Sequence, residues 1–263
     1  MWEHPVRKRL QDGLPVLATT VTTANVELAA HVAGLGFQLV WVEMEHSPIT
    51  LETLRLMVMG TRGLPAAIFA RVPVNDLWTA KRVMDQGVSG VIFPFTSTAA
   101  LARQAVAACK YPPAGRRGAG ASLAKATWPD SGDYYDSADR NGMVVTVVED
   151  RSGLENIDEI AATPGLDVIF IGTTDLSFSL GLRGEQDGPE HRAAVAKIVA
   201  AAKRHGKFAG RPAASAAKVQ EYMEQGFLFF QTATELGLLT AGANQLLEPL
   251  GLAAGRPRPG ALY

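Results

Sequence analysis

The sequence predicts an α/β protein that forms a single (β/α)₈ (TIM) barrel domain over residues 1–263. Short apolar runs of strand length alternate along the whole chain with segments whose apolar residues recur at helical spacing. Eight such runs occur, and a helical pattern follows each of them. A doubly wound open sheet usually has fewer strands and one switch point, so the barrel is the favoured architecture.

The individual elements follow from this alternation. The predicted strands are Pro15–Val21, Phe37–Val42, Ala66–Val72, Gly90–Phe95, Met143–Val148, Asp167–Ile171, Lys207–Arg211 and Phe227–Gln231. The predicted helices are Asn25–Ala33, Leu51–Met59, Asp76–Gln86, Ala99–Lys110, Leu154–Ala161, Glu190–His205, Ala214–Gln225 and Leu236–Leu250. The segment from Tyr111 to Gly142 is rich in Gly and Pro and is predicted to be irregular.

The composition excludes several classes of protein. The chain is 47% hydrophobic and 19% charged, and its formal net charge is -1. This near-neutral charge argues against nucleic acid or an anionic membrane as a partner. No signal peptide is recognisable in the first residues, and no stretch approaches the ~20 apolar residues of a membrane span. A single cysteine, Cys109, excludes an internal disulfide, so we expect a cytoplasmic protein.

Polar side chains follow several of the predicted strands. In a (β/α)₈ barrel the carboxyl ends of the strands form the active face, so these residues are expected to share one mouth. They are Glu43, Glu45, His46, Arg71, Glu149, Asp150, Thr173, Thr174, Asp175 and Arg211. A purely structural barrel would not need this collection of acids, arginines and a histidine.

Glu149 and Asp175 follow adjacent strands and are the candidate metal ligands. Each alone could instead be a helix-capping or first-turn acid. Together they would place two like charges at one partly buried spot, which a divalent cation would relieve. Ligation by oxygen atoms suits Mg²⁺ or Mn²⁺, whereas no histidine pair stands at the spacing of a zinc site.

His46 is the candidate proton carrier and Arg71 the candidate anion-binding residue. His46 ends a strand between acids that could orient its ring and raise its basicity. Arg71 follows a buried strand, where it needs an acid or an anionic ligand as its partner. No lysine stands clearly at a strand end, which argues against a Schiff-base mechanism. The GRRGAG stretch, 115–120, is either a loop on the substrate side or a flexible turn.

Taken together, the stretches WVEMEH, ARVP, VMDQGVSGVIFP, YPPAGRRGAG, VVED and FIGTTDLSFSLG resemble the 4-hydroxy-2-oxoheptanedioate aldolase family. These are metal-dependent (class II) pyruvate aldolases of the aldolase/citrate-lyase superfamily, and the resemblance covers nearly the whole chain. It implies a (β/α)₈ barrel with an exchanged C-terminal helix, assembled into a homo-oligomer (hexamer or trimer). It also implies reversible cleavage of a 4-hydroxy-2-oxo acid into pyruvate, or a related 2-oxo acid, and an aldehyde. Hydroxy-oxo-diacids of aromatic catabolism and 2-keto-3-deoxy sugar acids are both candidate substrates.

The resemblance also implies roles for individual residues. Glu149 and Asp175 would bind Mg²⁺ or Mn²⁺, with Co²⁺ as a further candidate. His46 would be the base and Asp85 the acid that makes it more basic. Arg71 would stabilise the transition state, and the backbone N–H of Thr174 would contact the pyruvate carboxylate beside Arg71 and Asp175. Weaker, supporting roles fall to Glu43, Glu45 and Arg117.

Three residues depart from the family pattern, and they keep alternative functions open. The family has Asp at the position of Glu43, commonly Gln at that of Val147 and usually Pro at that of Thr173. The apolar Val147 keeps open a related enolate enzyme, such as an oxaloacetate decarboxylase or a carbon–carbon-forming synthase. A non-catalytic, metal-dependent ketoacid-binding protein is the alternative of another class. The 111–142 segment, with Arg117 and Trp128, is expected to shape the aldehyde side of the site, in its own or a neighbouring subunit.

Overall fold

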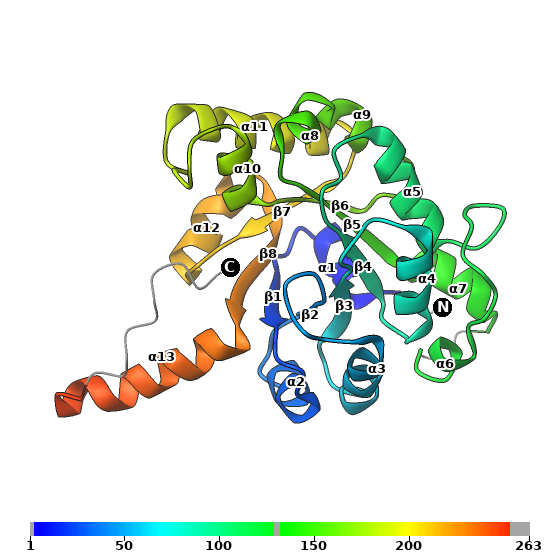
Figure 1. The fold of residues 1–263 in the computed structure, drawn as a ribbon, viewed down its shortest axis with the longest axis horizontal. Coiled ribbons are helices and arrows are strands. Elements are labelled where there is room, and N and C mark those ends of the chain that lie inside the picture. Colours follow the sequence, from blue (N-terminus) through cyan, green and yellow to red (C-terminus); the bar gives the residue numbers. More distant parts are fainter. Residues whose placement is uncertain (1–2, 129–131, 253–263) are drawn as a thin grey trace.

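Eight parallel strands close into a barrel in chain order, which confirms the predicted fold (Figure 1). The computed structural model describes residues 3–128 and 132–252. The strands are β1 (Val16–Val21), β2 (Leu39–Glu43), β3 (Ala67–Arg71), β4 (Gly90–Phe93), β5 (Met143–Val148), β6 (Val168–Ile171), β7 (Phe208–Pro212) and β8 (Phe227–Thr234).

Helices surround the barrel, as expected for strands that are linked by right-handed crossovers (Figure 1). Those expected from the sequence are α2 (Val26–Ala33), α3 (Leu51–Gly60), α4 (Leu77–Asp85), α5 (Ala99–Cys109), α8 (Arg151–Glu155), α9 (Ile157–Ala161), α11 (Pro189–Arg204), α12 (Ala216–Glu224) and α13 (Glu235–Leu247). Those not expected are α1 (Pro5–Gln11), α6 (Ser122–Lys125), α7 (Tyr134–Asn141) and α10 (Thr173–Ser179), whereas the 3₁₀ turn η1 (Glu248–Leu250) forms the end of the helix predicted over Leu236–Leu250. The prediction that the 111–142 segment is irregular was therefore wrong for α6 and α7.

Short polar side chains cap several of the helices that follow strands. Asp76 accepts a hydrogen bond from the Thr79 N–H at 2.7 Å, and Asp150 accepts one from the Gly153 N–H at 2.6 Å. Each such cap satisfies a backbone donor that the first helical turn cannot pair, which is typically worth about 1 kcal/mol. Asp150 therefore caps α8 and does not line the cavity at the carboxyl ends of the strands.

The inside of the barrel is packed and closed at its amino end. Strand residues that point inward form a buried cluster with aromatic rings from Trp41, Phe69, Phe170 and Phe229. Val6 and Leu10, both on α1, belong to the same cluster and are 1% exposed. The barrel is therefore closed at its amino end, where side chains fill its interior, and it can be entered only at the carboxyl ends of the strands.

Two glycines make room for these rings. A Cβ at Gly90 would lie 2.6 Å from ring atoms of Phe69, and one at Gly210 would lie 2.8 Å from the Phe170 ring. Real Cβ atoms do not approach so closely, so larger residues at either position would force the rings to move. Glycine in these two strands is thus a requirement of packing inside the barrel.

The last long helix, α13, runs away from the barrel (Figure 1). It carries exposed leucines, among them Leu239 at 58% and Leu246 at 69% exposure. The exchange of this helix between subunits stays a prediction. No helix within residues 3–128 and 132–252 combines the length and the apolar character that a membrane crossing requires.

Candidate active site

A cavity of about 520 Å³ lies at the carboxyl ends of the strands. It brings together five residues that the sequence predicted to act in one site, namely His46, Arg71, Glu149, Thr174 and Asp175. Apolar side chains of the upper barrel, including Trp41, Val147 and Phe170, form part of its wall. These strand ends therefore share one cavity, whereas the expectation that Arg211 joins them was wrong, because its side chain lines a different cavity.

Glu43 organises the end of β2 from beneath the cavity. Its carboxylate is fully buried, and Oε1 accepts hydrogen bonds from the backbone N–H groups of Glu45 (2.8 Å) and His46 (3.0 Å). Oε2 accepts from Arg71 Nε at 2.6 Å and from Trp41 Nε1 at 3.2 Å. Glu43 therefore fixes both the turn that carries His46 and the direction of Arg71. Glu at this position, where the family has Asp, still contacts both elements.

Glu45 links the candidate base to the candidate anion-binding residue. Its Oε2 lies 3.0 Å from Arg71 Nη1 and 3.6 Å from His46 Nε2. Burial raises the pKa of the Glu45 carboxyl, and the positive charge of Arg71 opposes that rise. Glu45 thus stands where it can stabilise a protonated His46, whose side chain is half exposed at the rim.

Glu149 is an acid held in a desolvated position after β5. It is 3% exposed, and its Oε1 accepts a hydrogen bond from the Phe95 N–H at 2.7 Å. Burial raises the pKa of Glu149 to about 7, and the negative charges of Glu45 and Asp175 add to this rise. The Phe95 N–H and Arg71 act in the opposite direction. A raised pKa of this origin marks a carboxylate that lacks a sufficient positive partner.

Thr174 and Asp175 lie in the first turn of α10, directly after β6. The residue before this helix is Gly172, which supplies no side-chain cap. A Cβ there would lie 2.6 Å from Glu149, so glycine allows the turn to approach the acid. Thr174 Oγ1 accepts a hydrogen bond from Gln186 Nε2 at 3.2 Å. Gln186 therefore supports the first turn of α10 on the side away from the cavity that Thr174 lines.

The carboxylates of the site repel one another, and a divalent cation would relieve this repulsion. Glu43, Glu45, Glu149 and Asp175 outnumber Arg71, which is already engaged with Glu43 and Glu45. Glu149 and Asp175 are left to offer oxygen atoms to the same cavity, and oxygen is the donor that Mg²⁺ and Mn²⁺ prefer. Within the described part of the chain, no group of three or more His, Cys, Asp or Glu side chains forms a metal site. Two carboxylates from the protein would suffice for Mg²⁺, which usually keeps several waters.

Asp85 pairs with Arg117 at the other end of its own barrel, and its predicted role toward His46 stays a prediction. Asp85 is the last residue of α4, and this end of the helix lies at the amino end of the barrel, next to the start of β4. Its Oδ1 accepts a hydrogen bond from Arg117 Nη2 at 2.9 Å. The carboxylate nearest to the His46 ring in the described contacts is that of Glu45.

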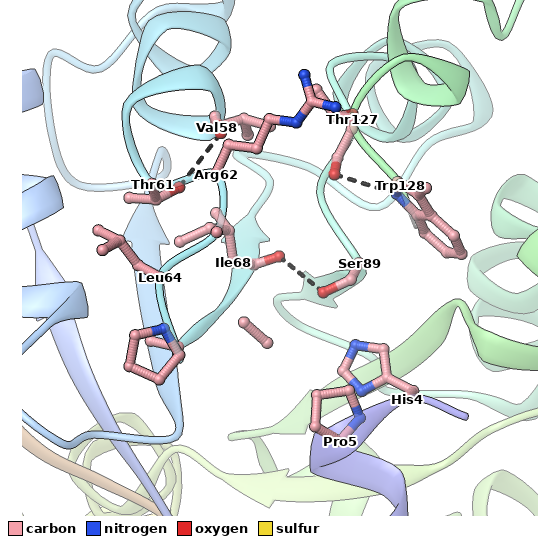
Figure 2. A pocket seen from close by; sticks show the side chains of 15 residues that line it. His4, Pro5, Val58, Thr61, Arg62, Leu64, Ile68, Ser89, Thr127 and Trp128 are labelled. Carbon is pink, nitrogen blue, oxygen red and sulfur yellow. Dashed lines mark hydrogen bonds between the residues drawn. The ribbon is translucent and has the colours of Figure 1, made fainter. Parts of the chain in front are cut away.

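Trp128 also lies at the amino end, beside a separate cavity of about 300 Å³ (Figure 2). Its Nε1 donates a hydrogen bond to the carbonyl of Gly87 at 3.1 Å. Arg117 and Trp128 are thus remote from the catalytic mouth of their own chain. A role of the 111–142 segment at the aldehyde side would have to be played in a neighbouring subunit.

Gln231 lines the active-site cavity and was missed by the sequence reasoning. Its Nε2 donates a hydrogen bond to Thr20 Oγ1 at 2.8 Å. The signal was available, because Gln231 follows the inward-facing Phe229 by two residues in β8, and alternate strand residues share a face. An amide therefore enters the cavity from β8, whereas Val147 leaves the β5 wall apolar.

Comparison with known proteins agrees with this geometry. Over 222 residues the chain is 34% identical to a 5-keto-4-deoxy-D-glucarate aldolase of Klebsiella pneumoniae, covering 84% of this chain and 87% of that protein. The solved structure of an HpcH/HpaI aldolase from Desulfitobacterium hafniense has a TM-score of 0.87 at 25% identity, and covers 97% of this chain and 100% of the other. A family protein from Burkholderia cenocepacia has a TM-score of 0.85 at 27% identity, covering 94% and 98%.

Residues 20–241, which run from β1 into α13 and include every candidate ligand, match one family over most of the chain. With the closed barrel and the acidic mouth at the strand ends, this match settles the class of enzyme as a carbon–carbon lyase. The chain belongs to the HpcH/HpaI aldolase/citrate lyase family.

Proposed function

We propose that the protein reversibly cleaves a 4-hydroxy-2-oxo acid into pyruvate and an aldehyde, through the enolate of pyruvate. The observation that carries this proposal is the convergence of two carboxylates, an arginine and a histidine in one cavity at the strand ends. Cleavage of an aldol needs a site that stabilises negative charge on the ketone oxygen and a group that moves a proton.

The residues divide this work between them. A divalent cation held by Glu149 and Asp175 would act as a Lewis acid toward the ketone of the bound oxo acid. Arg71 adds a fixed positive charge, and its fork is held in place by Glu43 and Glu45 before the substrate arrives. The Thr174 N–H, in the first turn of α10, binds the carboxylate of the oxo acid.

His46 moves the proton. It takes the proton of the C4 hydroxyl as the bond between C3 and C4 breaks, which releases the aldehyde and leaves the enolate of pyruvate. It then returns a proton to C3 and so forms the methyl group. Glu45, 3.6 Å from the ring nitrogen, stabilises the protonated imidazole between these steps.

The substrate we favour is a deoxy keto sugar acid. The support is the 34% identity to 5-keto-4-deoxy-D-glucarate aldolases over most of both chains. An acid of that kind splits into pyruvate and a small aldehyde that also carries a hydroxyl and a carboxylate. Condensation of pyruvate with 2-hydroxy-3-oxopropanoate, compared with succinate semialdehyde, separates this substrate class from the hydroxy-oxo-heptanedioates.

We also propose that the protein acts as a cytoplasmic homo-oligomer, a hexamer or trimer, with α13 exchanged. The exposed leucines of α13 support an oligomer, since apolar helix faces of this kind usually pack against protein. The buried, reduced Cys109 is in keeping with a cytoplasmic location.

The first test follows the methyl protons of pyruvate in D₂O by NMR, with protein that has been stripped with EDTA. We expect the methyl signal to persist without metal and to disappear after Mg²⁺ or Mn²⁺ is added, because exchange requires the enolate. His46→Gln is expected to slow this exchange by roughly 10²–10⁴-fold, the usual contribution of a positioned acid–base group.

His31→Gln serves as the matched control, because His31 is exposed on α2 away from the cavity. Its exchange rate should equal that of the unchanged protein. If pyruvate binds but its methyl protons never exchange with either metal, the proton transfer assigned to His46 is wrong. A decarboxylase, tested with oxaloacetate, or a ketoacid-binding protein would then be the better description.

A further inference from the structure

A third cavity, of about 480 Å³, lies outside the barrel between α11 and α12. Its inner wall includes Arg211 of β7 and Phe227 of β8, and its sides include Val195 of α11 and Tyr222 of α12. Arg211 reaches this space because Gly210 faces the rings inside the barrel, so the next residue of the strand points outward. This cavity is separate from the mouth that contains Glu149 and Asp175.

Among the residues that the structure describes, Arg211 is a buried cation with no ion-pair partner. It is 8% exposed, and its Cζ lies 3.6 Å from the centre of the Tyr222 ring and 5.4 Å from that of Phe227. Its Nε is buried and has no hydrogen-bond partner within the described residues. No carboxylate in residues 3–128 or 132–252 forms an ion pair with it.

The nearby acids Glu221 and Asp187 act on this charge from a distance, and within the described residues neither forms an ion pair with it. Glu221 lies on α12 but is paired with Lys218, whose Nζ is 2.8 Å from Glu221 Oε2. Asp187 is exposed on the loop before α11. A buried guanidinium with an unsatisfied donor is unfavourable, and ion pairing with an anion is the usual remedy. Stacking on Tyr222 keeps the guanidinium of Arg211 rigid and preformed for a planar acceptor.

We propose that this cavity binds a small organic monocarboxylate, with its carboxylate on Arg211 and its apolar body between Val195, Val199 and Phe227. The buried guanidinium of Arg211, which has no ion pair within the described residues, is the charge that a carboxylate would meet inside the cavity. The fork of an arginine matches the two oxygens of a carboxylate. The apolar side walls favour a hydrocarbon or aromatic body over an inorganic ion.

The site is connected to the active-site turn through two of its lining residues. His191 Nε2 lies 3.0 Å from the Thr173 carbonyl oxygen, and Gln186 donates to Thr174 Oγ1. An occupant of the cavity thus contacts the side chains that support the first turn of α10. The cavity is therefore separate from the active-site cavity, but both are in contact with the first turn of α10.

The probe for the test is 4-fluorobenzoate, followed by ¹⁹F NMR while it is titrated into the full-length protein with Mg²⁺ and saturating pyruvate. We expect saturable line broadening that pyruvate does not abolish. Arg211→Met, which keeps the length of the side chain, should weaken binding by roughly 10- to 100-fold, the usual effect of losing a charge-assisted hydrogen bond. Arg103→Met, an exposed arginine on α5, should leave the binding constant unchanged.

A second pair of variants tests the position without touching the charge. Ala196 lines the cavity and is exposed on α11, so Ala196→Phe should fill the mouth and abolish binding. Ala193→Phe, exposed on the same helix outside the cavity, should not. The proposal is overturned if broadening is absent, if it survives Arg211→Met, or if it is lost in Arg71→Met, which would place the probe in the active site. Binding of inorganic phosphate in preference to the probe would overturn the carboxylate assignment.

Discussion

Replacing Arg71 with methionine is expected to lower kcat for both cleavage and methyl-proton exchange by roughly 10²–10³-fold. In the proposed reaction, Arg71 is the cation that the protein itself places beside the developing enolate oxygen. Glu43 and Glu45 hold it in that position, so its charge needs no rearrangement during the reaction. The rates of aldol cleavage and of methyl-proton exchange at saturating Mg²⁺ would test this expectation. The affinity for Mn²⁺, measured by electron paramagnetic resonance, would show whether metal binding is retained.

The same substitution leaves Glu43 buried without its guanidinium partner, so a loss of stability must be distinguished from a loss of catalysis. Arg71→Lys retains the charge and lacks only the fork, and it should recover much of the stability but little of kcat. Thermal unfolding of both variants provides the comparison. An Arg71→Met enzyme that remains folded, binds Mn²⁺ and turns over at the original rate would remove Arg71 from the mechanism.

Glu149→Gln is expected to weaken Mg²⁺ or Mn²⁺ binding by more than the roughly 10–100-fold that loss of an outer-shell partner usually costs. The amide preserves the shape of the side chain and removes the charge that a hard cation requires. Titration calorimetry with Mn²⁺ would measure the change. Asp150→Asn is the matched control, because Asp150 is the adjacent acid and caps α8. It should bind metal normally and lose only a modest amount of stability.

The pKa of Glu149 predicts how metal binding depends on pH. In the metal-free protein, burial raises this pKa from 4.5 to about 7, so the folded state keeps a proton that the unfolded chain has already lost. The stabilising contribution of this protonation is full at low pH and disappears as the pH rises through about 7. A cation that binds below pH 7 must displace the proton, so affinity should increase with pH up to about 7 and then level off. An affinity that is constant from pH 5 to 8 would contradict this assignment.

The positions of the site residues could be predicted because parallel strands end on the same side of a barrel. Glu149, Asp175, His46 and Arg71 each follow an apolar run, and the closed strand order brings those ends together. Their convergence is a consequence of topology, which the alternation of strands and helices already indicates.

Contacts that depend on side-chain direction could not be predicted in the same way. Asp85 ends a helix, and the helices of a barrel run opposite to its strands, so Asp85 lies at the amino end of its own barrel and its role toward His46 stays a prediction. Glu45 is the acid beside His46, because the Glu43 side chain is turned inward and binds the backbone and Arg71. The helices α6 and α7 escaped detection because they are short and the segment around them is rich in Gly and Pro. Gln231 was detectable only by its strand alternation with Phe229.

The plug formed by α1 and the inward aromatic rings has a kinetic consequence. Because the lower barrel is filled, substrate enters and products leave by the same opening at the strand ends. In the proposed reaction pyruvate is bound against the floor, near Glu149 and Trp41, while the aldehyde half extends toward the opening. Release is then ordered, with the aldehyde first and pyruvate last, and pyruvate becomes the product that competes with the substrate for the free enzyme.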